Sequence, residues 1–259
     1  MEVHQKKSYA LITGASSGIG EEFAKKLAKK GYPLILTARR EERLKKLAKK
    51  LKTQVIVIEA DLSSDSDRNR LIEKIRPYEI GILINNAGFG DCGAFTNTRL
   101  EKEMNMIEVN IKAVHFLTKK LLPGMLKNNS GYILNVASSA GLFPAGPYMA
   151  AYYATKSYVA SLTRAIAHEI KERGKNVYIG CLCPGPVNTE FNAVANVEFA
   201  LKGISPEFCA RYALKKMFQK KTVIIPTLTL KLAVFFIRFL PSNIMIALTA
   251  HQQKRKLYR

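Results

Sequence analysis

A tyrosine and a lysine four residues apart are the side chains of this sequence whose types and spacing suit proton transfer. Tyr152 and Lys156 lie in the run Ala-Tyr-Tyr-Ala-Thr-Lys, and on a helix this spacing places the ammonium beside the phenol. A nearby positive charge favours the phenolate and lowers the phenol pKa from about 10 toward the operating pH. The pair therefore suits carbonyl reduction or alcohol oxidation. A half-buried ring under a solvated cation has the same spacing, so the prediction depends on other parts of the chain.

A glycine-rich turn near the N-terminus has the sequence expected of a phosphate-binding loop. The apolar run of residues 9–13 predicts a buried strand, and residues 19–30 predict a helix. Gly14 and Gly18 lie between this strand and this helix and Gly20 lies in the first turn of the helix, with the spacing Gly-x3-Gly-x-Gly. Glycines allow close backbone approach, and the free amides and dipole of the helix attract a pyrophosphate. A tight structural bend could use the same glycines, but the flanking strand and helix favour the phosphate cradle.

Four motifs in chain order resemble those of the classical short-chain dehydrogenase/reductase family. They span residues 9–190, about seven tenths of the chain, and all four together are far more specific than any one of them. The resemblance is to NADP-dependent carbonyl, hydroxysteroid or ketoacyl reductases with a hydrophobic C-terminal extension. The motifs are TGASSGIG at 13–20, NNAG at 85–88, YYATK at 152–156 and PGPVNT at 184–189.

The resemblance implies a catalytic role for each matching residue. Tyr152 would donate the proton in reduction, while Lys156 would lower its pKa and hold the nicotinamide ribose. Asn110 would support a water-linked proton relay to the lysine. Ser138 would hydrogen-bond the substrate carbonyl.

The same resemblance implies the cofactor contacts. Asp61, after the third predicted strand, would lie against the adenine ring, and Thr189 would reach the nicotinamide carboxamide. Residues 86–88 would line the cleft. The implied cofactor-binding residues are Gly14, Ser16, Ser17, Gly18, Ile19, Gly20, Arg39, Arg40, Asp61, Leu62, Asn86, Ala87, Gly88, Tyr152, Lys156, Pro184, Gly185, Val187 and Thr189.

Two neighbouring serines compete for the catalytic position. Ser138 keeps the spacing of the family from Asn135, whereas Ser139 keeps the commonest family separation from the tyrosine, thirteen residues. We favour Ser138, because the register of the strand before it fixes its direction. The loop of residues 142–149, with two prolines, is the better place to accommodate one extra residue.

The end of the second predicted strand determines which nicotinamide cofactor is expected. An acidic residue there would bind the adenosine ribose hydroxyls and repel a 2′-phosphate. This chain instead has Arg39 and Arg40, whose guanidinium groups suit phosphate recognition. The sequence therefore favours NADP over NAD. Alternatively, both arginines simply begin a basic helix, whose first turn carries Glu41 and Glu42 to complement the helix dipole.

Apolar runs that alternate with amphipathic stretches predict an α/β fold. The expected architecture is a doubly wound Rossmann-type fold with a mostly parallel seven-stranded sheet covered by helices on both faces. No linker divides the chain, so residues 1–225 are expected to form a single dinucleotide-binding and catalytic domain, followed by a C-terminal helical extension at 226–259. The predicted strands are 9–13, 33–37, 54–59, 81–85, 132–137, 177–183 and 222–225.

Residues 227–240 form a strongly apolar stretch within the extension. Lys231 and Arg238 interrupt it and Pro241 ends it, so it is too short and too charged to span a bilayer. Two interpretations stay open: a helix packed on the protein's own core or on another subunit, or a helix lying in the membrane interface. The basic residues 254–259 would suit anionic lipid, but also plain solvation.

The formal charge of +21 could attract nucleic acid, anionic membranes or phosphorylated ligands. Paired lysines at helical spacing carry much of it, and no nucleic-acid module lies near them, so no specific nucleic-acid partner is expected. The polar residues 1–8 lack the apolar core of a signal peptide, which favours a cytoplasmic protein, with peripheral membrane contact as the open alternative. Four cysteines without Cys-x2-Cys spacing and four scattered histidines predict no metal site.

The expected substrate is an apolar small-molecule carbonyl or secondary alcohol. The loop residues that would face it are mainly apolar, and no arginine or lysine stands out as a partner for a substrate carboxylate or phosphate. These residues are Phe89, Phe143, Tyr148, Met149, Phe191 and the stretch 192–204.

Two classes of function stay open. The first is an oxidoreductase that transfers a hydride between NADP(H) and this substrate, with Tyr152 as general acid/base. The second is a non-enzymatic dinucleotide-sensing or scaffold protein on the same fold. The joint presence of Asn110, a serine at 138 or 139, Tyr152 and Lys156 favours the enzyme. The resemblance also implies a homodimer or homotetramer that pairs through helices near 152–173 and 102–121.

Overall fold

The computed structural model describes residues 8–195, 203–237 and 239–257. Its seven strands run parallel in one sheet with the order β3-β2-β1-β4-β5-β6-β7. Every strand begins and ends within one residue of its predicted position, and the doubly wound α/β fold is confirmed. The strands are β1 (Tyr9–Thr13), β2 (Leu34–Ala38), β3 (Val55–Glu59), β4 (Ile80–Asn85), β5 (Gly131–Val136), β6 (Val177–Leu182) and β7 (Val223–Ile224).

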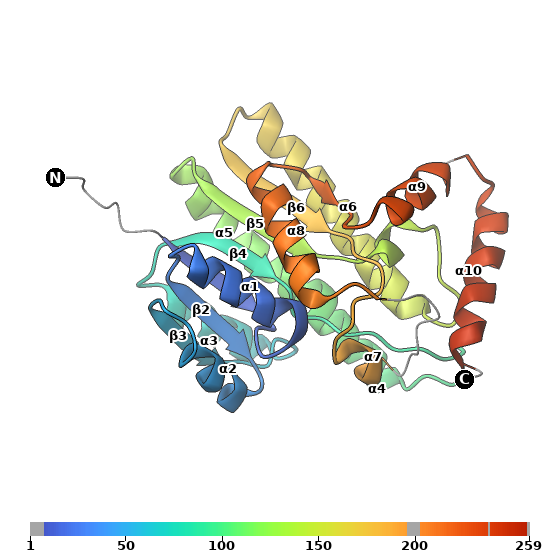
Figure 1. Cartoon of the computed structure of the whole chain (residues 1–259), viewed down its shortest axis with the longest axis horizontal. Helices are drawn as coiled ribbons and strands as arrows, with labels where there is room; N and C mark the ends of the chain where they lie inside the picture. Colours follow the sequence, from blue (N-terminus) through green and yellow to red (C-terminus); the bar gives the residue numbers. More distant parts are fainter. Residues whose placement is uncertain (1–7, 196–202, 238, 258–259) are drawn as a thin grey trace.

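Helices cover both faces of this sheet (Figure 1). They are α1 (Gly18–Lys29), α2 (Glu41–Ala48), α3 (Asp65–Ile75), α4 (Leu100–Ile107), α5 (Val114–Lys127), α6 (Ala150–Glu172), α7 (Phe191–Val194), α8 (Pro206–Phe218), α9 (Leu228–Ile237) and α10 (Ser242–Leu257). A π-helical segment, η1 (Glu108–Ala113), joins α4 to α5, and a short 3-10 helix, η2 (Ser139–Leu142), follows β5. Buried side chains of α1, α2 and α8 belong to one apolar core, and those of α3, α5 and α6 to another.

The strands separate these two cores by simple alternation. In β1, Ala10 and Ile12 belong to the core with α1 and α8, whereas Tyr9 and Leu11 belong to the core with α5 and α6. Successive strand residues point to opposite faces of a sheet, so an unbroken apolar run fills both cores. This is why continuous apolar runs in the sequence predicted strands of a covered parallel sheet.

The strand order reverses at β1, which lies between β2 and β4. In doubly wound sheets a ligand crevice opens at such a point, outside the carboxyl ends of the strands. The turn after β1 and the loop after β4 meet there, because the backbone amides of Asn86 and Ala87 each donate to Thr13 Oγ1 at 3.0 Å. The crevice is therefore framed by two of the predicted motifs.

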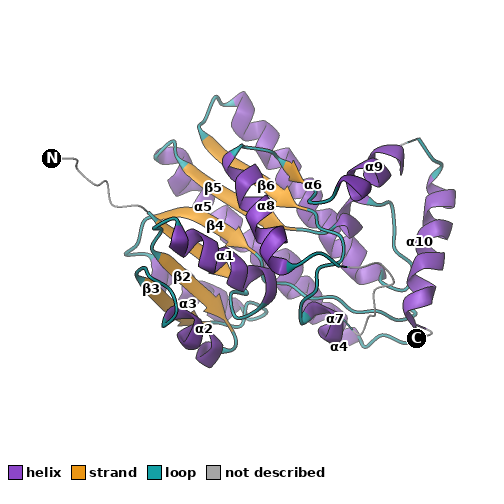
Figure 2. Cartoon of the chain, viewed as in Figure 1, coloured by secondary structure: helices purple, strands orange, loops and turns teal. Residues whose placement is uncertain are grey.

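The C-terminal helices α9 and α10 lie beyond the carboxyl ends of the strands (Figure 2). On α10, Met245, Thr249 and Gln253 lie one helical turn apart and are at most 5% exposed. One face of α10 therefore packs on the body of the protein.

The predicted apolar stretch forms α9, whose described residues are not buried. Leu230 and Lys231 turn toward the body: a Cβ built on Gly185 would lie 3.5 Å from Leu230, and the Lys231 ammonium donates to Tyr212 Oη at 2.7 Å. Within the part of the chain that the structure describes, no helix is long and apolar enough to cross a membrane. Arg238, Tyr258 and Arg259 lie outside the described residues, and the side chains of residues 255–257 are not described.

Candidate active site

The turn after β1 needs glycine for two reasons. Gly14 and Gly18 have φ angles of +63° and +58°, a region that other residues rarely adopt. A Cβ on Gly14 would lie 2.8 Å from Ala87 Cα, and one on Gly18 would lie 3.1 Å from Thr189 Cγ2. The turn thus brings the N-terminus of α1 against the loops after β4 and β6, which suits a bound pyrophosphate.

A cavity of about 450 Å³ opens at this edge of the sheet. Ser138 and nearly all of the predicted cofactor residues line this cavity. These residues are far apart in the sequence, and the fold brings them together. The predicted cofactor residues in the lining are Gly14, Ser16, Ser17, Gly18, Ile19, Arg39, Arg40, Asp61, Leu62, Asn86, Ala87, Gly88, Tyr152, Lys156, Pro184, Gly185, Val187 and Thr189.

Gly20 is the one predicted cofactor residue that is not among the residues lining the cavity. It is buried in the first turn of α1, where a Cβ would lie 2.3 Å from the carbonyl oxygen of Gly14. The third glycine of the motif therefore allows close packing of the helix on the turn, and its contact with a cofactor stays a prediction.

The structure brings Tyr152, Ser138 and Lys156 together on one wall of the cavity. A side-chain hydrogen bond joins Tyr152 and Ser138, and the Ser138 hydroxyl also accepts from the amide of Ala140 at 3.1 Å. The neighbouring Ser139 begins η2 and donates its amide to the carbonyl of Pro184 at 2.8 Å. The contacts of the tyrosine thus favour Ser138 of the two candidates.

Burial determines the protonation of the tyrosine and the lysine. It raises the pKa of Tyr152 to about 12, against an opposing effect of the hydrogen bond with Ser138. Burial also lowers the pKa of Lys156 to about 8. The Lys156 ammonium donates to the carbonyl of Val136 at 2.9 Å and lies 5.9 Å from the Tyr152 ring centroid. Burial is the largest cause of the raised Tyr152 pKa, and the lowering of that pKa by Lys156 stays a prediction.

Asn110 is fully buried in the π-helical segment η1 and holds the loop after β4. Its Oδ1 accepts from the amide of Phe89 at 3.1 Å, and its Nδ2 donates to the carbonyl of Phe89 at 2.9 Å and to Thr155 Oγ1 at 3.1 Å. A Cβ on Gly88 would lie 2.8 Å from Asn110 Oδ1 and 3.1 Å from Lys156 Nζ. Asn110 thus lies beside the lysine, and its part in a proton relay stays a prediction.

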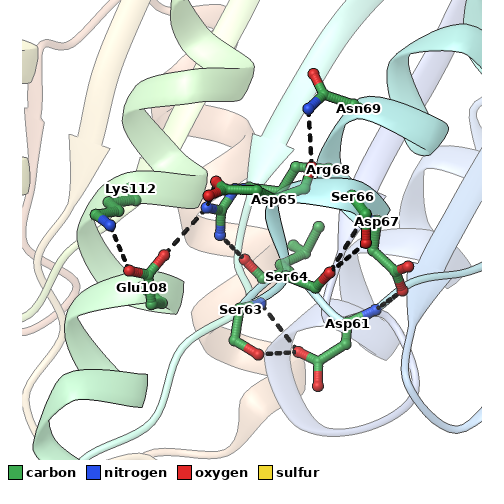
Figure 3. Close-up of polar contacts among 11 residues, drawn as sticks. Asp61, Ser63, Ser64, Asp65, Ser66, Asp67, Arg68, Asn69, Glu108 and Lys112 are labelled. Atoms are coloured by element: carbon green, nitrogen blue, oxygen red, sulfur yellow. Dashed lines mark hydrogen bonds and ion pairs between the residues drawn. The ribbon is translucent and has the colours of Figure 1, made fainter.

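The predicted adenine-contacting loop is held by a polar network (Figure 3). Asp61 Oδ1 accepts from the amide and the hydroxyl of Ser63 at 2.9 Å and 2.8 Å. Arg68, only 2% exposed, donates to the carbonyl of Leu62 at 2.5 Å and to Glu108 at 3.0 Å, and also pairs with Asp65. Because Glu108 begins η1, the network connects the Asp61 loop to the segment that carries Asn110.

The sequence of this chain matches a known family along most of its length. The family model described as short chain dehydrogenase matches residues 8–198. The chain belongs to the short-chain dehydrogenase family. It is 34% identical to a very-long-chain 3-oxoacyl-CoA reductase of Neurospora crassa over 184 residues, which cover 68% of this chain and 55% of that enzyme.

Two solved structures show the same fold as this short-chain dehydrogenase. A short-chain dehydrogenase from Sphingobium yanoikuyae in complex with NADPH is 29% identical with a TM-score of 0.81, covering 92% of this chain and 95% of that one. A short-chain dehydrogenase/reductase from Burkholderia phymatum in complex with NAD is 25% identical with a TM-score of 0.81, covering 89% and 92%. The prediction of a nicotinamide-dependent dehydrogenase or reductase is thereby confirmed.

The wall opposite the glycine turn of this short-chain dehydrogenase is mainly apolar. Of the predicted substrate-facing residues, Phe89, Phe143, Met149 and Phe191 line the cavity. Tyr148 does not line it and lies under the ammonium of Lys254, 5.7 Å from the ring centroid. In the predicted stretch 192–204, residues 196–202 lie outside the described part of the chain.

Several residues that line this cavity were not predicted from the sequence. Leu230 of α9 and Gln253 of α10 line it, and Gln253 Nε2 donates to Tyr153 Oη at 2.7 Å. Glu190 also lines the cavity. It contacts Arg40 and Arg43, which lie far from it in the sequence. No local signal marks these residues, because only the fold brings them to the cavity. Among the described residues no cluster of histidine, cysteine and carboxylate side chains suits a metal ion.

Proposed function

We propose that this short-chain dehydrogenase reduces apolar carbonyl compounds with NADPH and catalyses the reverse oxidation with NADP. The observation that carries the proposal is the contact of Tyr152 with Ser138, beside Lys156, in the wall of the cavity. The cofactor would supply the hydride. Tyr152 Oη would hold the proton that the carbonyl oxygen receives, and Ser138 Oγ would orient the same oxygen. Lys156 would hold the nicotinamide ribose and stabilise the phenolate that remains.

The protonation of this site supports reduction. Burial keeps the Tyr152 phenol protonated, since its pKa is raised to about 12. Near neutral pH the phenol is therefore ready to donate its proton when charge develops on the substrate oxygen. A protonated Lys156 would become more stable at that moment, because the phenolate beside it carries the opposite charge.

The proposed preference for NADP depends on Arg39 and Arg40, which line the cavity after β2. Arg40 Nη2 donates to Ser17 Oγ at 3.0 Å and to Ser16 Oγ at 3.4 Å, so its guanidinium lies at the glycine turn. Guanidinium groups and serine hydroxyls together suit a phosphate monoester. One similar structure contains NADPH and the other NAD, so the preference is argued from these side chains.

The proposed substrate is a bulky apolar ketone, aldehyde or secondary alcohol. Phe89, Phe143, Met149 and Phe191 supply an apolar wall, and Leu230 extends it. The similarity to a very-long-chain 3-oxoacyl-CoA reductase supports a long apolar carbonyl compound as one member of this class.

The test is NADPH absorbance during incubation with a panel of apolar ketones and aldehydes, for the wild type and for Tyr152→Phe. We expect turnover in the wild type and a loss of about a hundredfold to ten-thousandfold in the variant, with cofactor affinity retained. NADH beside NADPH measures the preference. Turnover that Tyr152→Phe leaves unchanged would remove this mechanism, and cofactor binding without any turnover would favour a dinucleotide-sensing or scaffold protein.

We also propose that residues 1–225 form one catalytic domain and that the extension 226–259 contacts an anionic lipid surface. Large apolar side chains of α9 and α10 point to solvent, and the chain carries a formal charge of +21. The exposed apolar residues are Leu228, Leu232, Phe235, Phe236, Phe239, Leu240, Ile244 and Leu248. We expect co-sedimentation with vesicles of anionic lipid that Phe235→Asp weakens. A second copy of the chain on this surface would instead give a dimer in light scattering that the same substitution separates.

A homodimer or homotetramer through α6 and through residues 102–121, which lie in α4, η1 and α5, is proposed from the family resemblance. Tyr158 of α6 is 37% exposed, and its hydroxyl lies 2.6 Å from His115 Nδ1 on α5. These two helices therefore present one joined outer face. An assembly that Phe235→Asp leaves intact would place the contact on this face and away from α9.

A further inference from the structure

Glu190 bridges two arginines at the glycine-turn end of the cavity. Its Oε2 accepts from Arg40 Nη1 at 2.8 Å, and its Oε1 accepts from Arg43 Nη1 at 2.5 Å. These pairs lower the pKa of the Glu190 carboxyl, with the hydrogen bond from Arg43 as the largest cause. The carboxylate is therefore ionised near neutral pH and faces the cavity.

One of these two guanidinium groups, that of Arg40, is also one that the proposed function assigns to a 2′-phosphate. A phosphate monoester carries roughly 1.5 to 2 negative charges near neutral pH and takes the same charge-assisted hydrogen bonds as a carboxylate. The two anions repel each other when they share a site. Arg40 therefore cannot hold both anions in its best geometry.

We propose that Glu190 is an internal occupant of the 2′-phosphate site, which the 2′-phosphate of NADP displaces. The inference rests on the proposed NADP preference and adds a residue that sets its strength. NAD has no phosphate at this position, so its binding leaves the two ion pairs in place. Glu190 thereby weakens NADPH binding selectively.

The displacement also reaches the catalytic end of the cavity, because Glu190 lies between Thr189 and Phe191. The Phe191 ring centroid lies 5.5 Å from that of Tyr152, and Thr189 lies against Gly18. When Glu190 is released, the start of α7 is no longer tied to Arg43 of α2 or to Arg40, the residue before α2. Recognition of the phosphate is therefore coupled to the position of a side chain that contacts the catalytic tyrosine.

The first experiment measures the dissociation constants of NADPH and NADH by calorimetry. Glu190→Gln keeps the size of the side chain and removes its charge, so we expect NADPH to bind about three- to tenfold more tightly and NADH to change by less than about twofold. Glu42→Gln is the matched control, because Glu42 is 79% exposed on its side chain and pairs with Lys45. NADPH affinity that is unchanged or weaker in Glu190→Gln, or equally raised in the control, would overturn the inference.

Arg40→Met separates this inference from the proposed function. A loss of NADPH affinity with unchanged NADH affinity supports the phosphate site, whatever Glu190→Gln does. If Arg40→Met affects neither cofactor, the proposed NADP site is wrong. If Arg40→Met weakens NADPH but Glu190→Gln does not tighten it, only the displacement is wrong.

A fluorescent reporter tests the coupling, since the chain contains no tryptophan. Phe191→Trp places one indole beside Tyr152. We expect its emission to shift on addition of adenosine 2′,5′-bisphosphate and not of adenosine 5′-monophosphate. In the double variant with Glu190→Gln, the shift should already be present without either nucleotide. Identical responses to the two nucleotides would show that the 2′-phosphate does not move this segment.

Discussion

At the scale of single residues, the burial of Lys156 opposes the positive charge that the proposed mechanism needs. Burial lowers its pKa to about 8, whereas the proposed mechanism uses its charge beside Tyr152. The ordinary pKa of the group is 10.5. Between these two values the native protein binds fewer protons than the unfolded chain, so the free energy of unfolding rises with pH in this window. Tyr152 acts in the opposite direction above about pH 10, because its pKa is raised.

Lys156→Met removes this titration, which gives a prediction for stability. The unfolding free energy of the wild type minus that of the variant should increase by on the order of 2 kcal/mol from about pH 8 to about pH 10. Urea unfolding at the two pH values measures it. Lys49→Met, at an exposed position on the end of α2, is the control and should show no such change. A difference that is constant with pH would show that Lys156 is not buried as described.

The two serines can be separated in the same assay of turnover. Ser138 contacts Tyr152, whereas Ser139 begins η2 and uses its amide to bind Pro184. Ser138→Ala should lower kcat/KM by about a hundredfold, since it removes a hydrogen-bond donor from the substrate oxygen. Ser139→Ala should change it by less than about twofold. Equal losses in both variants would contradict the assignment of Ser138.

At the scale of elements, Arg68 joins α3 to η1 and is the largest fully buried side chain among the described residues. Arg68→Leu leaves Glu108 and the carbonyl of Leu62 without this donor, and we expect a loss of about 3 kcal/mol in unfolding free energy. Arg70→Leu is the control, because Arg70 is 51% exposed and pairs with Asp67 on the surface. It should change stability by less than about 1 kcal/mol. Urea unfolding compares the two, and equal effects would show that burial of Arg68 contributes nothing.

The elements themselves were largely predictable from local sequence. Each strand consists mainly of apolar residues, and a run such as residues 9–12 fills two cores at once. The π-helical segment was not predictable, because its sequence, EVNIKA, suits an ordinary helix. Nor was the bridge of Glu190 to Arg40, since the two residues are 150 positions apart and meet only through the sheet order.

At the scale of the whole molecule, the C-terminal extension contributes Leu230, Gln252 and Gln253 to the lining of the cavity. Met245 is 5% exposed on the inner face of α10, whereas its neighbour Ile244 is 50% exposed. Met245→Asp places a charge against the body of the protein and should displace α10. We expect the KM for an apolar ketone to rise by about tenfold while the dissociation constant of NADPH stays unchanged. Ile244→Asp should leave both constants unchanged, and a rise in KM for it as well would point to an effect of charge alone.

Leu230 and Gln253, which line this cavity, lie outside the span of residues 8–198 that matches the family. The proton-transfer groups and the glycine turn lie inside that span. Replacement of the end of the chain would therefore change part of the cavity lining without changing the glycine turn, Tyr152 or Lys156. A change in the C-terminal extension would then alter the range of substrates, while the residues inside the matched span would keep the same reaction.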